Sequence, residues 1–226
     1  MIYLWYSLLA IGAYLIGNIS FAILLSKKKN KDITKMGSGN PGTMNMLRNF
    51  GFKTGLLTLV LDALKGAVPA LVGLLTLGER GLYIAGLAVI LGHIYPVFRK
   101  FKGGKGVACT LGVFLVANPI LTVIFFVVAF IYLYVFDYGA IASFIVVTAM
   151  TICEGINHAG DLLLSILIFS IFLIVWIAHR KNITRLLVGK ENKANLKRSI
   201  KKFINQGTTR KERKEQKKVD KEREIG

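Results

Sequence analysis

The sequence contains little cysteine, and this scarcity excludes two kinds of stabilisation. Its two cysteines, Cys109 and Cys153, lie inside apolar segments, without a second pair and without a histidine at metal-ligand spacing. Neither a disulfide framework nor a zinc site fits this pattern. We therefore expect both thiols to be packing residues, and we expect no metal and no other cofactor.

Acidic residues are also scarce, and the composition of a soluble domain is absent. Lysine and arginine number 30 against 12 aspartate and glutamate residues, which gives a formal net charge of +18. At the same time 54% of the 226 residues are hydrophobic, and the mean hydropathy is +0.55. Such a chain belongs in a membrane, where backbone polar groups require helices. The sequence predicts an all-α, polytopic membrane protein.

A cleavable secretory signal is missing as well. The stretch 2–25 has no basic region before it and no small-residue cleavage site, and its lysines follow it. We interpret it as the first of seven transmembrane helices, because runs of about 18 or more apolar residues can cross a bilayer. The expected spans are 2–25, 54–77, 82–98, 107–117, 119–136, 139–155 and 161–178.

The fourth span, 107–117, is short, and the charge distribution decides its interpretation. A dozen helical residues rise only ~18 Å, so this segment could also turn back. Basic residues concentrate in 27–53, in 99–105 and after His179. Basic loops are cytoplasmic, and all three regions share one side only if the fourth segment crosses. The N-terminus is then outside, the C-terminus is cytoplasmic, and the short helix leaves a water-reachable notch at the cytoplasmic face.

The composition changes abruptly after Lys190. We expect residues 1–190 to form the transmembrane domain and residues 191–226 to form a basic cytoplasmic tail. Such a tail is attracted to anionic headgroups of membrane lipids. No aromatic residue alternates with its charges after Phe203, which argues against nucleic-acid binding.

The first polar patch, residues 37–48, reads GSGNPGTMNMLR. It satisfies G-x-G-x-x-G, but a lysine-rich connector precedes it and Pro41 interrupts the turn into a helix, so it is no dinucleotide fingerprint. Small residues expose backbone N–H groups, and Asn45 and Arg48 follow one helical turn apart. This arrangement suits a phosphate or an oxyanion. The alternative is a flexible loop between helices.

The second patch, residues 92–107, carries glycines directly before the short helix. Its end reads FKGGKGV, in which Lys105 supplies a full positive charge. Backbone N–H groups at a helix N-terminus attract anions. The patch is no Walker A loop, because Arg99 replaces the first glycine and Gly106 replaces the magnesium-binding Ser or Thr. We predict an anion cradle, with a merely basic loop as the alternative.

The third patch follows the last span. On a continuing helix, His179, Asn182 and Arg185 would share one face. A histidine at a helix end can also be a simple capping residue. Within the second span, Asp62 and Lys65 lie one turn apart, and we expect them to pair in the interior because intramembrane charges are costly.

Together these patches resemble the bacterial acyl-phosphate:glycerol-3-phosphate acyltransferases. The ordered set is GSGNPGTMN-x-x-R, D-x-x-KG, GH-x-x-PVF-x-x-FKGGKGV and HR-x-N-I-x-R-L-x-x-G-x-E, spread over about residues 1–191. The resemblance implies a seven-helix inner-membrane enzyme with its active site on the cytoplasmic side. It implies transfer of a fatty acyl group from acyl phosphate to the sn-1 hydroxyl of glycerol 3-phosphate, which gives lysophosphatidic acid and phosphate.

The resemblance also implies the site residues and the partners. We expect His179, Asn182, Lys105, Ser38 and Arg48 to be catalytic, and Gly37, Gly39, Asn40, Asn45, Asp62, Lys65, His93, Gly103, Gly104, Gly106, Arg185 and Glu191 to bind substrate or phosphate. The partners are the two substrates, membrane lipids and a soluble enzyme that makes acyl phosphate. Met44 and Cys109 stand where the family usually has threonine, although Thr43 and Thr110 adjoin them.

The chemistry needs no protein nucleophile, because acyl phosphate is already activated. Cations and N–H groups that stabilise developing charge could supply most of the catalysis. We name His179 as the base for the hydroxyl proton, with a substrate phosphate oxygen as its competitor. The other large class of glycerolipid acyltransferases carries a histidine and an aspartate five positions apart. No histidine here has that partner, which excludes the acyl-CoA or acyl-carrier-protein chemistry of that class. A Ser-His-Asp triad is also unsupported, because Ser38 has no identifiable acidic partner. The alternatives are an anion or phospho-metabolite transporter and a membrane scaffold.

Overall fold

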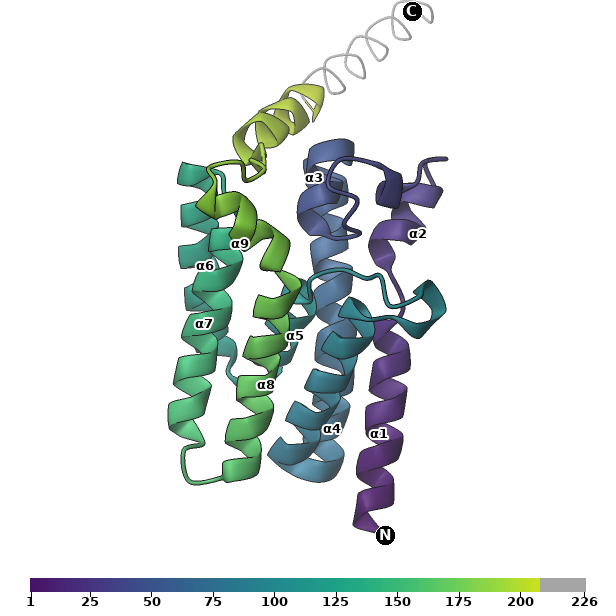
Figure 1. Ribbon diagram of the computed structural model, residues 1–226, viewed down its shortest axis with the longest axis vertical. Coiled ribbons are helices and arrows are strands. Elements are labelled where there is room, and N and C mark those ends of the chain that lie inside the picture. Colours follow the sequence, from purple (N-terminus) through teal and green to yellow (C-terminus); the bar gives the residue numbers. More distant parts are fainter. Residues whose placement is uncertain (208–226) are drawn as a thin grey trace, which may run out of the picture.

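The computed structural model describes residues 1–207, and helices make up its architecture (Figure 1). The longer helices are α1 (Ile2–Gly17), α4 (Phe52–Ile94), α5 (Val107–Ala117), α6 (Pro119–Phe136), α7 (Gly139–Asn157) and α8 (Leu162–Ala178). The shorter helices are α2 (Phe21–Lys27), α3 (Thr43–Phe50) and α9 (Arg180–Leu187), with 3-10 turns η1 (Ile33–Lys35) and η2 (Val97–Arg99). A further helix, the tail helix, covers residues 196–207. The described part of the chain contains no strand.

The first expected span is broken rather than continuous. α1 ends at Gly17, and α2 begins at Phe21. The Lys65 ammonium on α4 donates to the carbonyl oxygens of Gly17 and Ile19, and so occupies backbone acceptors at the break. A Cβ on Gly17 would lie 2.3 Å from the Val89 carbonyl oxygen, so α1 packs closely against α4 there. The break is therefore stabilised by tertiary contacts.

Helix α4 contains two expected spans and folds back on itself at Gly78. This glycine has φ 68° and ψ −160°, a conformation that is strained for other residues. A Cβ on Gly73 would lie 2.3 Å from the Gly81 carbonyl oxygen, so the two arms touch beside the turn. The second arm ends at Ile94, before Pro96, whereas we expected helix as far as residue 98.

The number of membrane crossings is less sharply defined than the helices. Among residues 1–207, four helices are long and apolar enough to cross a membrane, or five if α8 and α9, bent by 56°, are taken together. Helix α5, with 11 residues, is shorter than such a span, and α4 is a single helix by this criterion although it covers two expected spans. The seven crossings and the sides of the two termini stay predictions.

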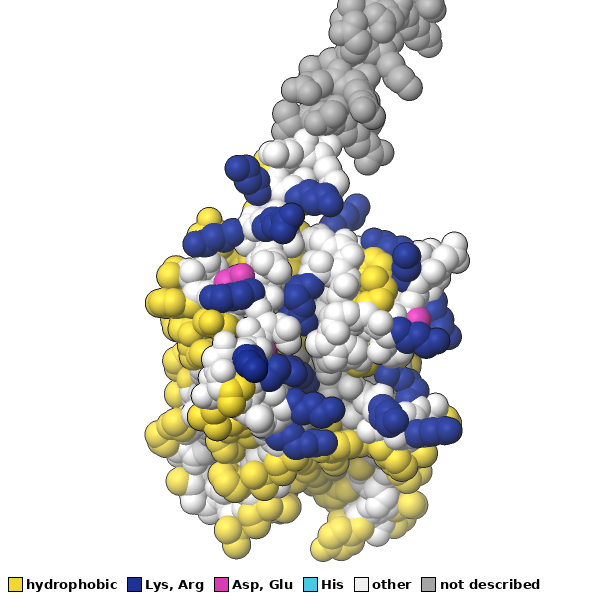
Figure 2. Space-filling view, turned by 45° about the horizontal axis from the view of Figure 1, so that its top comes forward, with side chains coloured by type: hydrophobic (Ala, Val, Ile, Leu, Met, Phe, Trp, Pro, Cys, Tyr) yellow, Lys and Arg dark blue, Asp and Glu magenta, His cyan; other side chains and the backbone are white. Residues whose placement is uncertain are grey.

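The two ends of the molecule differ in chemistry. Figure 2 shows Lys and Arg side chains around the end from which the tail helix leaves, and hydrophobic side chains over the body beyond it. Large apolar side chains on the outside of the helices include Leu75, Ile120, Ile156 and Leu162, each more than 70% exposed. Outward-facing apolar side chains fit a lipid environment, and the basic end fits an interface with water.

Candidate active site

A cavity lies at the basic end, and it gathers most of the residues singled out in the sequence. This inner cavity has about 790 Å³ of empty space, which includes open solvent at its mouth. It is lined by Ser38, Asn40, Asn45, Arg48, Asp62, His93, Lys105, Gly106, His179, Asn182, Arg185 and Glu191, among others. An outer cavity shares Ser38, Asn40, Lys105, Asn182 and Arg185 with it and adds Gly39, Gly103 and Gly104. Gly37 and Lys65 line neither.

Asn45 organises the first patch rather than pointing a free amide at the cavity. Its Oδ1 accepts from the Ser38 backbone N–H at 3.1 Å, and its Nδ2 donates to the Met36 carbonyl at 2.9 Å. Gly37 has φ 56°, and a Cβ there would lie 2.4 Å from Asn45 Oδ1. The buried amide therefore holds the loop in shape. The loop then presents Ser38, whose hydroxyl accepts from Arg48 at 3.2 Å.

The glycines of the second patch allow close packing on His93. A Cβ on Gly103 would lie 2.0 Å from the His93 carbonyl oxygen, and one on Gly104 would lie 2.0 Å from His93 Nε2. The Gly104 N–H donates to the same carbonyl, so it is not free for an anion as we expected. The structure thus assigns packing and loop shape to this glycine pair.

Two helix N-termini meet at the inner cavity. The first residues of α3, Thr43 and Met44, and those of α5, Val107 and Ala108, line it. The N–H groups of a helix's first turn have no partner within the helix and carry a partial positive charge. Gly106, with φ 85°, turns the chain into α5. Both helix starts therefore add to the positive potential of the cavity.

Lys105 is the central cation of the site. Its Nζ donates to Asn182 Oδ1, Asn182 Nδ2 donates to Glu191 Oε1 at 2.7 Å, and Arg185 Nε contacts Glu191 Oε2 at 2.9 Å. Burial lowers the pKa of Lys105 to about 8, opposed by Glu191 and reinforced by Arg185 and Arg48. The lysine is thus a largely desolvated cation at neutral pH. Its hydrogen bond to Asn182, which is itself hydrogen-bonded to Glu191, holds it in one orientation.

His179 lies at a bend, not on a continuing helix. It ends α8 and precedes α9, whose axis turns by 56°. His179, Asn182 and Arg185 therefore do not lie on one continuous helix, as we expected. All three side chains nevertheless line the inner cavity. His179 Nδ1 lies 2.8 Å from the Val175 carbonyl oxygen, which only accepts, so Nδ1 carries the hydrogen. Within residues 1–207 the Nε2 atom of this buried imidazole forms no hydrogen bond with another side chain, so it is left as an acceptor.

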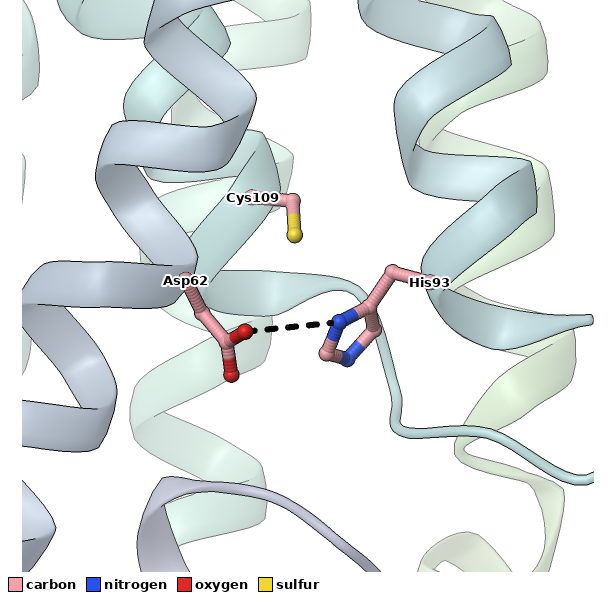
Figure 3. Close-up of side chains that lie close together, drawn as sticks. All are labelled: Asp62, His93 and Cys109. Atoms are coloured by element: carbon pink, nitrogen blue, oxygen red, sulfur yellow. Dashed lines mark ion pairs between the residues drawn. The ribbon is translucent and has the colours of Figure 1, made fainter. Parts of the chain in front are cut away.

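Asp62 and Lys65 form the expected buried pair, with Nζ and Oδ1 2.9 Å apart. His93 Nδ1 lies 3.8 Å from the same Asp62 oxygen, and Cys109 adjoins both (Figure 3). Our expectation of no metal site considered only spacing along the chain, whereas the fold brings His93 and Asp62 close to Cys109 from other positions. The Lys65 ammonium already supplies a cation to the carboxylate, which disfavours a divalent metal there.

An apolar groove adjoins the inner cavity. It shares Thr43, Met44, Leu59, Val107, Gly139 and Ser143 with that cavity, and continues between α4, α5, α6 and α7. Its far part is lined by apolar side chains such as Leu111, Phe130 and Val146. No sequence pattern indicated the residues that α7 contributes, because Gly139 and Ser143 belong to no polar motif. The site is thus a basic, partly desolvated cavity beside an apolar channel.

These features define a multi-pass membrane protein with a basic cavity at the edge of its apolar body, and the comparisons name the family. Residues 7–189 match the family described as Glycerol-3-phosphate acyltransferase. A glycerol-3-phosphate acyltransferase of Thermoanaerobacter pseudethanolicus is 39% identical over 197 residues, covering 86% of this chain and 98% of its own. One of Geotalea daltonii is 40% identical over 186 residues, covering 81% and 95%.

A solved structure also matches the fold and the sequence of this chain. The crystal structure of PlsY (YgiH), an integral membrane glycerol 3-phosphate acyltransferase, in its glycerol 3-phosphate form, matches with a TM-score of 0.77 and 37% identity. The match covers 83% of this chain and 94% of that one. This chain belongs to the glycerol-3-phosphate acyltransferase family, as its motifs predicted. The family gives no support to the transporter and scaffold alternatives.

Proposed function

We propose that this protein transfers a fatty acyl group from acyl phosphate to the sn-1 hydroxyl of glycerol 3-phosphate. The carbonyl carbon gains a bond to the glycerol oxygen and loses its bond to the phosphate oxygen, so the products are lysophosphatidic acid and inorganic phosphate. The observation that carries the proposal is the junction of the Lys105 cavity with an apolar groove through shared walls. One substrate is an anion with a long apolar chain, and this junction accommodates both parts.

The donor fits the inner cavity and the groove together. Its acyl chain would lie between α4, α5, α6 and α7, where the groove is lined almost entirely by apolar side chains. Its phosphate would meet Lys105 and the N-termini of α3 and α5. A preformed cation and helix N–H groups stabilise the charge that builds on a departing phosphate. The acyl-phosphate donor would therefore enter from the lipid side, with its phosphate leaving group in contact with Lys105 and the two helix N-termini.

Glycerol 3-phosphate fits the outer cavity. This cavity is lined by Lys102, Arg180, Lys181 and Arg185, and shares Lys105 with the inner one; no acidic side chain lines it. Arg185 is paired with Glu191, but within residues 1–207 Lys102, Arg180 and Lys181 form no salt bridge, and such cations suit a small dianion from water. The shared residues bring its hydroxyl towards the acyl carbonyl, and holding both reactants in one place supplies much of the rate.

The hydroxyl proton needs an acceptor during the attack. His179 is suited to the role, because its Nδ1 hydrogen is held by Val175 and its Nε2 remains an acceptor at the cavity. A phosphate oxygen of glycerol 3-phosphate is the competing acceptor. Replacing His179 with glutamine keeps a hydrogen-bonding side chain without a basic nitrogen. A loss of kcat with retained binding of glycerol 3-phosphate supports the histidine, and an unchanged kcat assigns the step to the substrate.

The orientation in the membrane is part of the proposal. The N-terminus lies outside, and the active site faces the cytoplasm of a bacterial inner membrane, where a soluble enzyme can supply acyl phosphate. Single cysteines placed at Lys29, Lys102 and Lys193 should react with an impermeant thiol reagent only from the cytoplasmic side, in a chain whose Cys109 and Cys153 are replaced. Labelling of any of them from outside contradicts this topology.

The activity is tested with purified protein in lipid, given acyl phosphate and labelled glycerol 3-phosphate. We expect labelled lysophosphatidic acid with the acyl group at sn-1 and one phosphate released per turnover. Acyl-CoA and acyl carrier protein thioesters serve as matched alternative donors. Turnover with a thioester at the rate seen with acyl phosphate would refute the donor assignment, and acylation at sn-2 would refute the acceptor position.

A further inference from the structure

A second basic cavity lies outside the active site, between the start of α4 and the tail helix. This basic pocket is lined by Lys29, Leu47, Arg48, Asn49, Phe50, Gly51, Phe52, Lys53, Asn195, Arg198, Ser199, Lys202, Phe203 and Gln206. Its lining includes five basic side chains and no acidic one. The side chains come from three separate segments of the chain, at residue 29, at residues 47–53 and at residues 195–206. The pocket therefore concentrates positive charge through the fold and not through sequence proximity.

Within residues 1–207 these five cations form no salt bridge, and Glu191 and Asp137 act on Arg48 only from farther away. Lys29 Nζ donates to the Thr54 hydroxyl at 2.8 Å, and Arg48 donates to the Ser38 hydroxyl. Cations that converge without a carboxylate repel one another, and an anion from outside relieves that repulsion. A phosphate group, with several acceptor oxygens, matches the several donors that converge here.

The position of the tail helix is fixed by a docked segment before it. Asp137, between α6 and α7, accepts from the backbone N–H groups of Asn195 and Leu196 at 3.0 Å each. Lys193 donates to the Phe136 carbonyl and lies 3.9 Å from the centre of the Tyr138 ring. These contacts position the tail helix so that it lies beside the start of α4, where Phe203 approaches Phe52. One wall of the pocket therefore comes from residues beyond the family match, which ends at residue 189.

The pocket also has an apolar side. Phe203 of the tail helix lies 5.8 Å, centre to centre, from Phe52, and its side chain is 45% exposed. Phe52 and Leu47 line both the basic pocket and the apolar groove. An anion bound here thus has apolar surface directly beside it. A free ion would leave that surface uncovered, whereas an amphiphile would cover it.

We propose that the basic pocket binds the phosphate headgroup of an anionic membrane lipid. The lipid chains would pack beside Phe52 and Phe203, and the headgroup would contact cations from α4 and the tail helix. The site differs from the active site, although Arg48 lines both. Headgroup binding would thus anchor the tail helix to the body of the protein and to the bilayer surface at once.

The tail helix offers a matched pair of variants for the test. Arg198 and Lys202 line the pocket, whereas Lys197 and Lys201 are the same distance apart on the same helix and do not line it. Arg198→Gln/Lys202→Gln and Lys197→Gln/Lys201→Gln remove equal charge. Because each interfacial basic residue contributes a factor of about five to binding anionic lipid, the first pair should weaken binding about 25-fold. The second pair should weaken it less than about twofold if the pocket is specific.

Binding is measured on the full-length, detergent-solubilised protein by native mass spectrometry, with short-chain phosphatidylglycerol as the probe and phosphatidylcholine as the neutral control. Because the readout is binding, the result is independent of the proposed reaction. Equal losses from the two variant pairs would overturn the site and leave only general attraction to a basic tail. Displacement of phosphatidylglycerol by equimolar inorganic phosphate would overturn the lipid assignment in favour of a free-phosphate site.

Discussion

Lys105 should matter more for turnover than any other lysine in this protein. It lies where the outer and inner cavities meet, is largely removed from water, and is oriented by Asn182. Truncation to alanine removes the charge that faces the departing phosphate and leaves Asn182 and Glu191 without their cation. Loss of one preorganised group of this kind typically lowers kcat about 10²- to 10³-fold, or roughly 3–4 kcal/mol of transition-state stabilisation.

Lys102 provides the matched control for this prediction. It is an exposed lysine in the same glycine-rich segment and lines the outer cavity but not the inner one. We expect Lys102→Ala to keep kcat within about threefold and to act mainly on the KM for glycerol 3-phosphate, since its exposed charge lines the outer cavity and does not face the departing phosphate. Both variants are assayed in the same lipid, with glycerol 3-phosphate binding measured separately. Equal and mild defects would refute the reasoning, because the segment would then be an ordinary basic loop.

The lowered pKa of Lys105 predicts the alkaline limb of the pH profile. The protonated lysine is the active form, and its pKa is lowered to about 8 mainly by burial. In the free enzyme kcat/KM should therefore fall as pH rises through about 8, earlier than an exposed lysine with a pKa of about 10.4 would allow. Lys105→Arg keeps its charge and should move this limb upward. An unmoved limb in an active Lys105→Arg variant would assign it to another group.

The remaining predictions concern the scaffold of the site. Asp62→Leu leaves the Lys65 ammonium buried without its carboxylate, which costs about 3–5 kcal/mol, so thermal unfolding in detergent should begin at a lower temperature; adding Lys65→Met should restore much of the loss. Gly104→Ala brings a Cβ to 2.0 Å from His93 Nε2 and should displace the segment and lower turnover, whereas wild-type turnover would show that the segment adapts. Asp137→Ala removes the cap of the tail helix, worth about 1 kcal/mol, and should raise amide hydrogen exchange there but not in α4.

The sequence predicted the grouping of the polar patches well, for a physical reason. Basic loops share one side of a membrane, so motifs far apart in the chain, such as those containing Arg48, Lys105 and Asn182, converge at one end. The one-turn spacing of Asp62 and Lys65 likewise predicted their pairing, because a helix fixes such distances. These predictions needed only local geometry and sidedness.

Other features depend on tertiary packing, which the sequence did not reveal. The break after Gly17 is linked to a lysine on α4, and the bend at His179 replaces the continuous helix that we expected. The amide of Asn45 is used inside its loop, although the same residue type on the same face could equally have met a ligand. The approach of His93 to Cys109 joins residues from different helices, so spacing along the chain gave no signal.

The way in which Glu191 and Leu196 are placed has a practical consequence for any shortened form of this protein. Glu191 contacts two residues of the proposed active site, Asn182 and Arg185, and Leu196 lines the apolar groove, yet both lie beyond the family match. A chain cut at Lys190 would lose Glu191 from the inner cavity and Leu196 from the apolar groove together with its tail. Lost activity would then say nothing about the tail itself. A cut after Gly207 keeps Glu191 and Leu196 in place. Comparing the activity of that shortened chain with that of the full chain isolates the contribution of the basic residues after Gly207.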